Sequence, residues 1–204
     1  MISNMENYDD CGYLEIIKGP MFSGKTTRLL DRYKKFSYCG IPMLVINYAN
    51  DTRYSETELS THDKQMIPCT RVYLLSDIID LSNFDNKKIN TVEQQFIDSK
   101  VILINEGQFF TDIVKWVTIA VEKHHKQIYI CGLNTDFKRN TFGDWLNLER
   151  LSDNVVQLQA FCSNCKKRPA LFSHRLTNES TIEVIGSESY IPVCRKCYND
   201  INKN

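Results

Sequence analysis

Apolar residues in this chain occur as short runs bounded by polar or glycine-containing stretches. Residues 101–104, V-I-L-I, form one such run, which is too short for a helix and rich in β-branched side chains. A run of this kind is typical of a strand in the middle of a parallel sheet, where both faces are buried. Similar runs predict further strands at residues 13–18, 41–46, 71–75 and 127–131.

Helical periodicity separates several of these runs. Residues 26–36 place their apolar side chains on one side, which predicts an amphipathic helix that packs on a sheet. Residues 112–123 are also helical in pattern. Strands that alternate with helices predict an α/β fold with a mostly parallel sheet, helices on both faces and a ligand site at the carboxyl ends of the strands.

The composition gives no sign of a strongly charged partner. The chain has 204 residues, enough for one large domain or a main domain with a small one, and its 25 basic and 25 acidic residues give a formal net charge of zero. This balance argues against a nucleic-acid or membrane partner. Residues 1–10 are polar and acidic, unlike a secretory signal, and no apolar run is long enough to span a bilayer. We therefore expect a cytoplasmic protein whose cysteines are thiols or metal ligands.

A glycine turn joins the first predicted strand to the first predicted helix. Residues 19–26 read G-P-M-F-S-G-K-T and match the phosphate-binding pattern G-x-x-x-x-G-K-[ST] at every specified position. In this pattern the backbone N–H groups of the turn and the positive end of the helix dipole hold phosphate oxygens. The Lys25 ammonium reaches the outer phosphates, and the Thr26 hydroxyl holds Mg²⁺. The alternative is a glycine turn that precedes a helix by chance.

A carboxylate follows directly after the run at residues 101–104. Residues 105–110 read N-E-G-Q-F-F, so Glu106 is expected at the carboxyl edge of the sheet, beside the phosphates. From there Glu106 can attract Mg²⁺ or take a proton from the attacking group. The alternative is a surface glutamate in a turn.

Four of the eight cysteines form two C-x-x-C pairs, Cys162 with Cys165 and Cys194 with Cys197. In an intracellular protein, two such pairs predict a structural Zn²⁺ site with four sulfur ligands and no position for catalytic water. The alternatives are a redox dithiol or four unrelated thiols. The interval of 28 residues between the pairs predicts a long loop, and long ordered loops are usually functional. The other cysteines read as ordinary thiols: Cys11, Cys39, Cys69 and Cys131.

Together these motifs resemble those of the type II thymidine kinases, a family of cellular, bacterial and large DNA virus enzymes. The likeness extends in register from about Tyr13 to Tyr198. Besides the glycine turn and the paired C-x-x-C, it rests on D-T-R-Y (51–54), E-G-Q-F-F (106–110), C-G-L-N-T-D-F-K-R (131–139) and E-V-I-G-S-E-S-Y (183–190). The resemblance implies a P-loop NTPase (RecA-like) domain at residues 13–156 and a small zinc-binding domain with a lasso loop at 157–198. Residues 1–12 are expected to form a disordered tail and residues 199–204 a C-terminal tail, and both ends are expected to be mobile.

The resemblance also implies a reaction and a set of site residues. ATP would phosphorylate the 5′-hydroxyl of thymidine, and of deoxyuridine, with Mg²⁺ in the site and Glu106 as the catalytic base. Arg53 would offset the charge that develops on the phosphates. The implied ATP-binding residues are Gly19, Pro20, Met21, Phe22, Ser23, Gly24, Lys25, Thr26, Asp51, Thr52, Arg53, Asn105, Glu106, Gly107 and Gln108.

A second set of residues is implied for the nucleoside. It consists of Met21, Phe109, Leu133, Phe137, Phe142, Ser173, Ile182, Glu183, Val184, Ile185, Gly186 and Tyr190. By pattern alone, apolar members of this set are more often core than substrate contacts. The family further implies a homotetramer and inhibition by thymidine triphosphate.

The chain departs from the family pattern at several positions. Asn105 stands where the family usually has an aspartate that helps hold Mg²⁺, so we expect weaker Mg²⁺ binding with the chemistry intact. Asn134 and Thr135 replace Asp-Gly, and residues 140–141 replace Lys-Pro, which puts the geometry of that loop in doubt. Ser173 stands where a threonine is usual.

Two other functions are compatible with parts of the sequence. One is a phosphate-loop NTPase that binds nucleic acid through a zinc ribbon, since the short basic clusters at 166–168 and 195–196 lie beside the cysteines. The other is a nucleotide-gated switch, for which the guanine-reading N-K-x-D motif is missing from the sequence.

Overall fold

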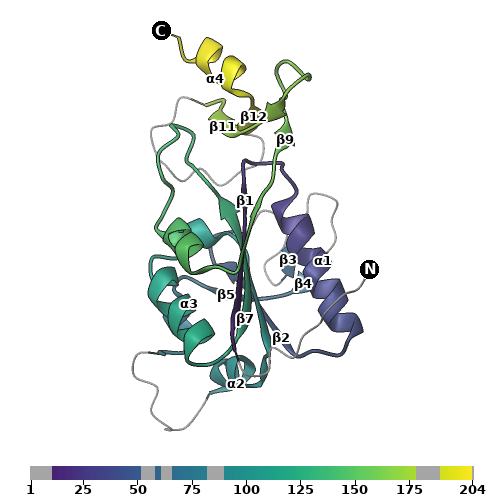
Figure 1. Ribbon diagram of the computed structural model, residues 1–204, viewed down its shortest axis with the longest axis vertical. Helices are drawn as coiled ribbons and strands as arrows, with labels where there is room; N and C mark the ends of the chain where they lie inside the picture. The colour runs from purple at the N-terminus through teal and green to yellow at the C-terminus, as the bar shows by residue number, and fades with distance from the viewer. Residues whose placement is uncertain (1–10, 52–57, 61–65, 82–89, 178–188, 204) are drawn as a thin grey trace.

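A six-stranded sheet forms the centre of the molecule (Figure 1). The computed structural model describes residues 11–51, 58–60, 66–81, 90–177 and 189–203. All neighbouring strands of this sheet are parallel, in the order β5-β2-β6-β7-β1-β8. The strands are β1 (Tyr13–Gly19), β2 (Met43–Tyr48), β5 (Thr70–Val72), β6 (Val101–Ile104), β7 (Gln127–Leu133) and β8 (Asn154–Gln157).

The predicted strands are present, with small shifts at their ends. The run at 101–104 is a strand over its full predicted length. The strand predicted at 41–46 begins later, at Met43, since Pro42 has no N–H to donate to a neighbouring strand. The edge strand β8 was not predicted, because its residues are mostly exposed and lack an apolar run. It continues the sheet to Gln157, just past the predicted boundary at residue 156.

Successive strand residues point to opposite faces of the sheet, so the strands contribute to two cores. On one face, Leu44, Ile46 and their neighbours pack with the helices α2 (Thr91–Asp98) and α3 (Ile113–Glu122) and the 3₁₀ segment η4 (Trp145–Leu151). On the other, Val45 and its neighbours pack with α1 (Lys25–Tyr38). The predicted α/β architecture with helices on both faces is confirmed (Figure 1).

Helix α2 was not predicted from the sequence, although its start carries a clear signal. The Asn90 side chain accepts hydrogen bonds from the backbone N–H groups of Val92 and Glu93, each at 2.9 Å. In return, the Glu93 carboxylate accepts from the Asn90 N–H at 2.7 Å. This reciprocal capping satisfies N–H groups that have no partner within the helix.

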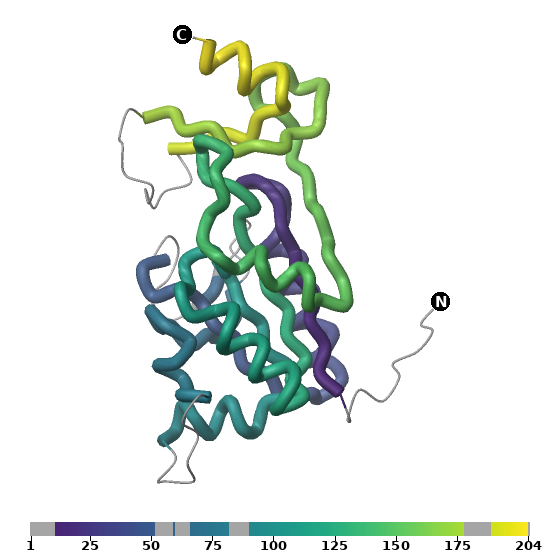
Figure 2. Tube along the Cα trace, turned by 60° about the vertical axis from the view of Figure 1, so that its left-hand side comes forward, coloured from purple at the N-terminus to yellow at the C-terminus, as the bar shows by residue number. Residues whose placement is uncertain are grey.

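The chain ends in a small lobe that lies beyond the carboxyl end of β1 in both views (Figures 1 and 2). The lobe contains two antiparallel pairs, β9 (Ala160–Phe161) with β10 (Pro169–Ala170) and β11 (Phe172–Arg175) with β12 (Tyr190–Val193). Helix α4 (Arg195–Ile201) follows, and it continues beyond residue 198, where the zinc-binding segment was predicted to end. The remaining short elements are β3 (Glu58–Ser60), β4 (Met66–Pro68), η2 (Leu75–Asp77) and η3 (Gly107–Phe109).

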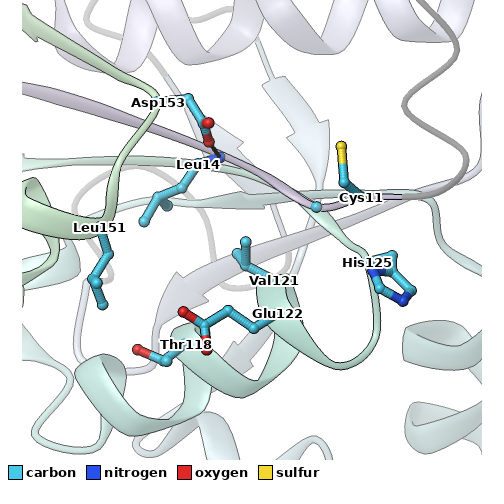
Figure 3. A pocket seen from close by; sticks show the side chains of 9 residues that line it. Cys11, Leu14, Thr118, Val121, Glu122, His125, Leu151 and Asp153 are labelled. Carbon is cyan, nitrogen blue, oxygen red and sulfur yellow. Dashed lines mark hydrogen bonds between the residues drawn. The ribbon is translucent and has the colours of Figure 1, made fainter.

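A pocket of about 300 Å³ lies at the opposite end of β1, between the start of that strand and α3 (Figure 3). Its lining includes Cys11, Leu14, Val121 and His125. This position is remote from the glycine turn, so the pocket is not part of the predicted site. Among the described residues, no helix has the length and apolar character needed to cross a membrane.

Candidate active site and metal centre

The glycine turn has the local geometry of an anion-binding loop. Strand β1 ends at Gly19, and Gly24 caps α1 with φ of 82°, a conformation that glycine adopts without steric cost. The first turn of α1 carries no acidic side chain to compete with an anion. The Ser23 hydroxyl is buried without a hydrogen-bond partner among the described residues. The Lys25 ammonium donates to the Pro20 carbonyl at 2.8 Å and so lies over the turn.

Glu106 occupies a backbone conformation that is uncommon for its residue type. Its φ is 56°, in the left-handed region, and its side chain is buried. The Gln108 amide donates to a Glu106 carboxylate oxygen at 2.6 Å and accepts from the Leu133 N–H at 2.9 Å. Gly132 makes this approach possible, because a Cβ there would lie 2.6 Å from the Gln108 oxygen. Gln108 therefore fixes the direction of the Glu106 carboxylate relative to β7.

The glycine turn and the end of β6 meet through side chains. The Thr26 hydroxyl donates to the Asn105 amide oxygen at 3.4 Å, which brings the residue beside Glu106 against the start of α1. The Asn105 amide donates in turn to Asn47, and Asn47 donates to Asp51. Asn47 was not among the predicted site residues, since its only signal in the sequence is a polar side chain near the carboxyl end of an apolar strand.

Aromatic rings gather beside this carboxyl edge. Phe109 is stacked on Tyr48 with ring centroids 4.9 Å apart, and it meets Phe142 edge-on at 5.3 Å. The predicted residues Phe109 and Phe142 thus lie together. Tyr48 was missed, because the strand was predicted to end at residue 46, whereas β2 continues to Tyr48 and places this aromatic residue at the same edge.

The small lobe contacts the glycine turn and the loop after β7. The backbone N–H of Met21 donates to the Ser173 hydroxyl at 3.0 Å. The Arg175 guanidinium lies 3.9 Å from the centroid of the Phe137 ring, and its Nε donates to the Tyr190 hydroxyl at 3.0 Å. Phe137, Ser173 and Tyr190 are therefore grouped. Arg175, which is buried and lies on the same strand as Ser173, was not among the predicted site residues.

The loop after β7 is held together by hydrogen bonds to one aspartate. The buried Asp136 carboxylate accepts from the backbone N–H groups of Lys138 and Asn140 at 2.9 and 2.7 Å. It also accepts from the Asn140 side chain at 3.2 Å. Asn140, one of the departures from the family pattern, thus supplies a donor that stabilises the loop.

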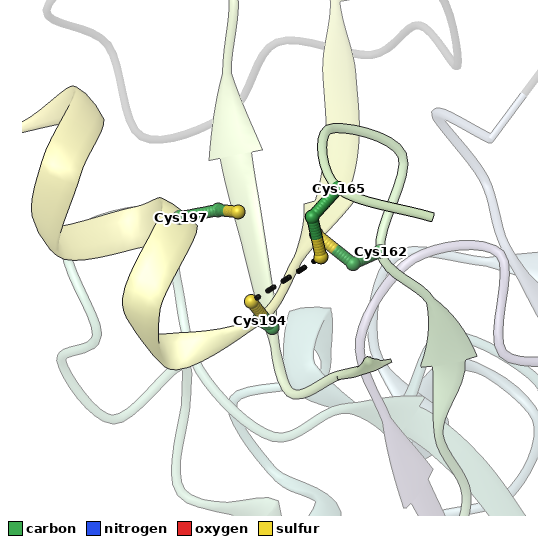
Figure 4. Close-up of side chains that lie close together, drawn as sticks. All are labelled: Cys162, Cys165, Cys194 and Cys197. Carbon is green, nitrogen blue, oxygen red and sulfur yellow. Dashed lines mark hydrogen bonds between the residues drawn. The ribbon is translucent and has the colours of Figure 1, made fainter. Parts of the chain in front are cut away.

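Four cysteines converge in the small lobe (Figure 4). The sulfurs of Cys162, Cys165, Cys194 and Cys197 all lie within 4.8 Å of one another, and the Cys165 and Cys194 sulfurs are 3.9 Å apart. Four sulfurs around zinc, with bonds of about 2.3 Å, give similar separations. No disulfide joins these residues. The donor set and its spacing therefore fit a structural zinc ion.

The thiols of this cluster differ in acidity. Burial opposes ionisation of Cys162, but hydrogen bonds from the backbone at Cys165, Cys194 and Asn164 outweigh it and lower its pKa to about 6. Burial and hydrogen bonds with the other thiols raise the pKa of Cys197 to about 12. Four thiolates packed together repel one another, and a divalent cation removes this conflict.

Several predicted site residues lie outside the described part of the chain. These are Thr52, Arg53, Ile182, Glu183, Val184, Ile185 and Gly186.

A parallel sheet with a glycine turn and a carboxylate at its carboxyl edge defines an α/β protein of the nucleotide-binding class. Residues 12–198 match the family model described as thymidine kinase. The chain is 38% identical to the cytosolic thymidine kinase of Gallus gallus over 188 residues, or 92% of this chain and 77% of the relative. It is 39% identical to the thymidine kinase of Monkeypox virus over 190 residues (93% and 98%) and to the cytosolic thymidine kinase of Homo sapiens over 188 residues (92% and 73%). The chain belongs to the thymidine kinase family.

Proposed function

We propose that this enzyme transfers the γ-phosphate of ATP to the 5′-hydroxyl of thymidine, giving ADP and thymidine monophosphate. The family match supports the reaction. The observation that carries the assignment of roles is the contact between Thr26 and Asn105, since it brings the neighbouring Glu106 beside the glycine turn. Glu106 takes the proton of the nucleoside hydroxyl as its oxygen attacks the γ-phosphorus.

The donor site is the glycine turn. Backbone N–H groups of the turn and of the first turn of α1 bind the phosphate oxygens, and the Ser23 hydroxyl is available for the same purpose. Lys25 leaves the Pro20 carbonyl to reach the outer phosphates. Thr26 would hold Mg²⁺, and the bound ion would supply positive charge that offsets the charge of the phosphates. Arg53 adds a fixed cation near the transferred group.

The acceptor site lies between the aromatic group at the sheet edge and the small lobe. Met21, Phe109, Leu133 and Phe142 supply apolar surface for the sugar and base. Phe137, Ser173 and Tyr190 close it from the lobe side, and residues 182–186 read the base edge with main-chain groups. Contacts of that kind need not recognise the thymine methyl group, so deoxyuridine is also a substrate.

Zinc has a structural role in this proposal. The four cysteines bind it and so anchor both ends of the interval at residues 166–193. Fixing the ends of a long loop lowers the entropy lost when the loop orders over a nucleoside.

Further properties rest on the resemblance and on the relatives. We propose a homotetramer that is inhibited by thymidine triphosphate, with the inhibitor in the acceptor site and its phosphates toward the glycine turn. A cytoplasmic location is supported by two of the relatives, which are named as cytosolic. A nucleic-acid or membrane partner is not part of the proposal, because the chain has no net charge.

Transfer of labelled phosphate from ATP tests this function. Thymidine, deoxyuridine, deoxycytidine and thymidine monophosphate are compared as acceptors, with Glu106→Gln as the control. Transfer to thymidine and deoxyuridine alone, abolished in the control, is the expected result. ATP hydrolysis that responds to nucleic acid, without transfer to any nucleoside, would instead support the zinc-ribbon NTPase.

A further inference from the structure

A continuous run of side-chain hydrogen bonds extends from Asp51 to Thr26, the last residue of the glycine turn. The Asn47 amide nitrogen donates to the Asp51 carboxylate at 3.3 Å. The Asn105 amide nitrogen donates to the Asn47 oxygen at 2.9 Å. The Asn105 oxygen accepts from the Thr26 hydroxyl at 3.4 Å and from the Cys131 thiol at 3.0 Å. Asn47 and Asn105 are nearly inaccessible to solvent, with exposed fractions of 1% and 2%.

The carboxylate fixes the direction of every bond in this run. A carboxylate accepts hydrogen bonds and does not donate them, so Asn47 must turn its NH₂ group toward Asp51. That leaves the Asn47 oxygen facing position 105, which must then provide a donor. Asn105 provides it from its own NH₂ group and presents its oxygen to Thr26.

This arrangement affects how the Thr26 hydroxyl can bind a cation. A hydroxyl has one hydrogen and two lone pairs. Because the hydrogen is engaged by Asn105, the lone pairs remain for a metal ion. Asn105 therefore orients Thr26, and Asn47 keeps Asn105 in the orientation that does so.

An aspartate at position 105 would conflict with the same run. It has no N–H group, so its oxygen would face the Asn47 oxygen in a place that water does not reach. If Asn47 reversed its amide to donate to the new carboxylate, its oxygen would face Asp51 instead. With asparagine at position 47, the run accommodates one carboxylate, at 51 or at 105, but not two.

We propose that Asp51, acting through Asn47, dictates an amide at position 105, and that Asn47 is a positioning residue for the metal-binding hydroxyl of Thr26. The second part rests on the proposed role of Thr26 in holding Mg²⁺. The first part concerns the protein alone. The amide at position 105 and the carboxylate at position 51 therefore belong together, and the negative charge of the run lies at Asp51.

Isosteric substitutions test the two parts separately. Asn105→Asp, Asp51→Asn and the double variant D51N/N105D are compared with the unmodified full chain by thermal unfolding without nucleotide. In the double variant, Asn47 can reverse its amide, donate to the new carboxylate at position 105 and accept from the new amide at position 51. We expect Asn105→Asp to lower Tm by about 5 °C and the double variant to regain most of that loss, because a buried clash between acceptors is removed. Equal Tm values for N105D and D51N/N105D would overturn the directed run.

Manganese binding, followed by electron paramagnetic resonance in the presence of ADP, tests the positioning role without relying on catalysis. Asn47→Ala should weaken Mn²⁺ binding several-fold, since Asn105 loses its anchor. D51N/N105D should bind Mn²⁺ about tenfold more tightly than D51N, because the carboxylate then lies beside Thr26. Unchanged Mn²⁺ affinity in all variants, with the Tm coupling present, would make the run structural only and overturn the role assigned to Asn47. Phosphate transfer to thymidine by the unmodified protein is unaffected by that outcome, so it does not bear on the proposed reaction.

Discussion

The backbone N–H of Met21 donates to the Ser173 hydroxyl at 3.0 Å, which joins the glycine turn to strand β11 of the small lobe. The two residues are 152 positions apart in the chain. Ser173 is buried, so the bond is shielded from water. The contact ties the proposed donor site to the lobe that closes the proposed acceptor site.

Loss of this bond should weaken the acceptor site. Ser173→Ala removes the acceptor for the Met21 N–H, at a cost of about 1 kcal/mol, or roughly fivefold. We expect kcat/KM for thymidine to fall by about that factor, while KM for ATP changes less. Steady-state kinetics with each substrate varied in turn measure both values. Ser173→Thr keeps the hydroxyl and should behave like the unmodified enzyme; a loss as large as that of the alanine variant would refute the role of the bond.

Gln108 should act on catalysis through Glu106. Gln108→Glu can still accept from the Leu133 N–H but cannot donate to Glu106 unless it is protonated. Two carboxylates at this distance repel each other, which raises the pH at which Glu106 acts as a base. We expect kcat to fall by about tenfold to a hundredfold at neutral pH, with the acidic limb of the pH–rate profile shifted to higher pH.

Gln108→Leu serves as the matched comparison, because it removes the bond without adding charge. It should lower kcat without that pH shift. Identical pH–rate profiles for the two variants would contradict the proposed link between Gln108 and Glu106.

Zinc should be bound by the cysteine cluster and should stabilise the small lobe. Cys162→Ser is expected to reduce bound zinc from about one ion per chain to near zero and to lower Tm, since structural zinc contributes directly to folding. Zinc content is measured by atomic emission after dialysis, alongside thermal unfolding. Cys39→Ser, which alters an exposed cysteine outside the cluster, is the control and should retain zinc. Full zinc content in the Cys162 variant would exclude this residue as a ligand.

An ion pair between a partly exposed arginine and a buried carboxylate links β1 to α1. The Arg32 guanidinium donates to both oxygens of the Glu15 carboxylate, at 3.0 and 2.8 Å, and Glu15 is fully buried. Arg32→Leu leaves that carboxylate without its cation, so we expect the free energy of unfolding to fall by about 3 kcal/mol. Urea denaturation measures this change. In the double variant E15Q/R32L the free energy of unfolding should fall by less than in Arg32→Leu. An equal fall in the two variants would show that the uncompensated Glu15 charge is not the cause.

Tyr13 should make the protein sensitive to alkaline pH. Burial, reinforced by the nearby Glu15 carboxylate, raises the pKa of the Tyr13 phenol above its usual value. The folded state therefore favours the neutral phenol, and stability is lost as pH rises above about 10, where the unfolded chain begins to ionise. Tyr13→Phe should lose less stability between about pH 9 and 11 than the unmodified protein. Parallel curves of unfolding free energy against pH would show that Tyr13 does not contribute.

Elements with local signals could be predicted from the amino-acid pattern alone. The apolar run at residues 101–104 became a buried strand because its side chains suit both faces of a parallel sheet. The motif G-P-M-F-S-G-K-T produced a strand end, a turn with a left-handed glycine and a helix start, all within one short segment. The spacing of Cys162, Cys165, Cys194 and Cys197 predicted their convergence, because metal-binding pairs have a characteristic separation.

Contacts between distant side chains, and the direction of the hydrogen bonds between them, depend on the folded arrangement of the strands. The edge strand β8 is held by pairing with β1 and has little apolar pattern of its own. Asn47, Tyr48 and Arg175 acquire their places from neighbours far along the chain, which no local pattern encodes. In the sequence, Asn105 in place of the family's aspartate indicated only the loss of a negative charge. In the fold it is a donor matched to the Asn47 oxygen, because a buried polar atom is stable only when a partner of the right kind faces it.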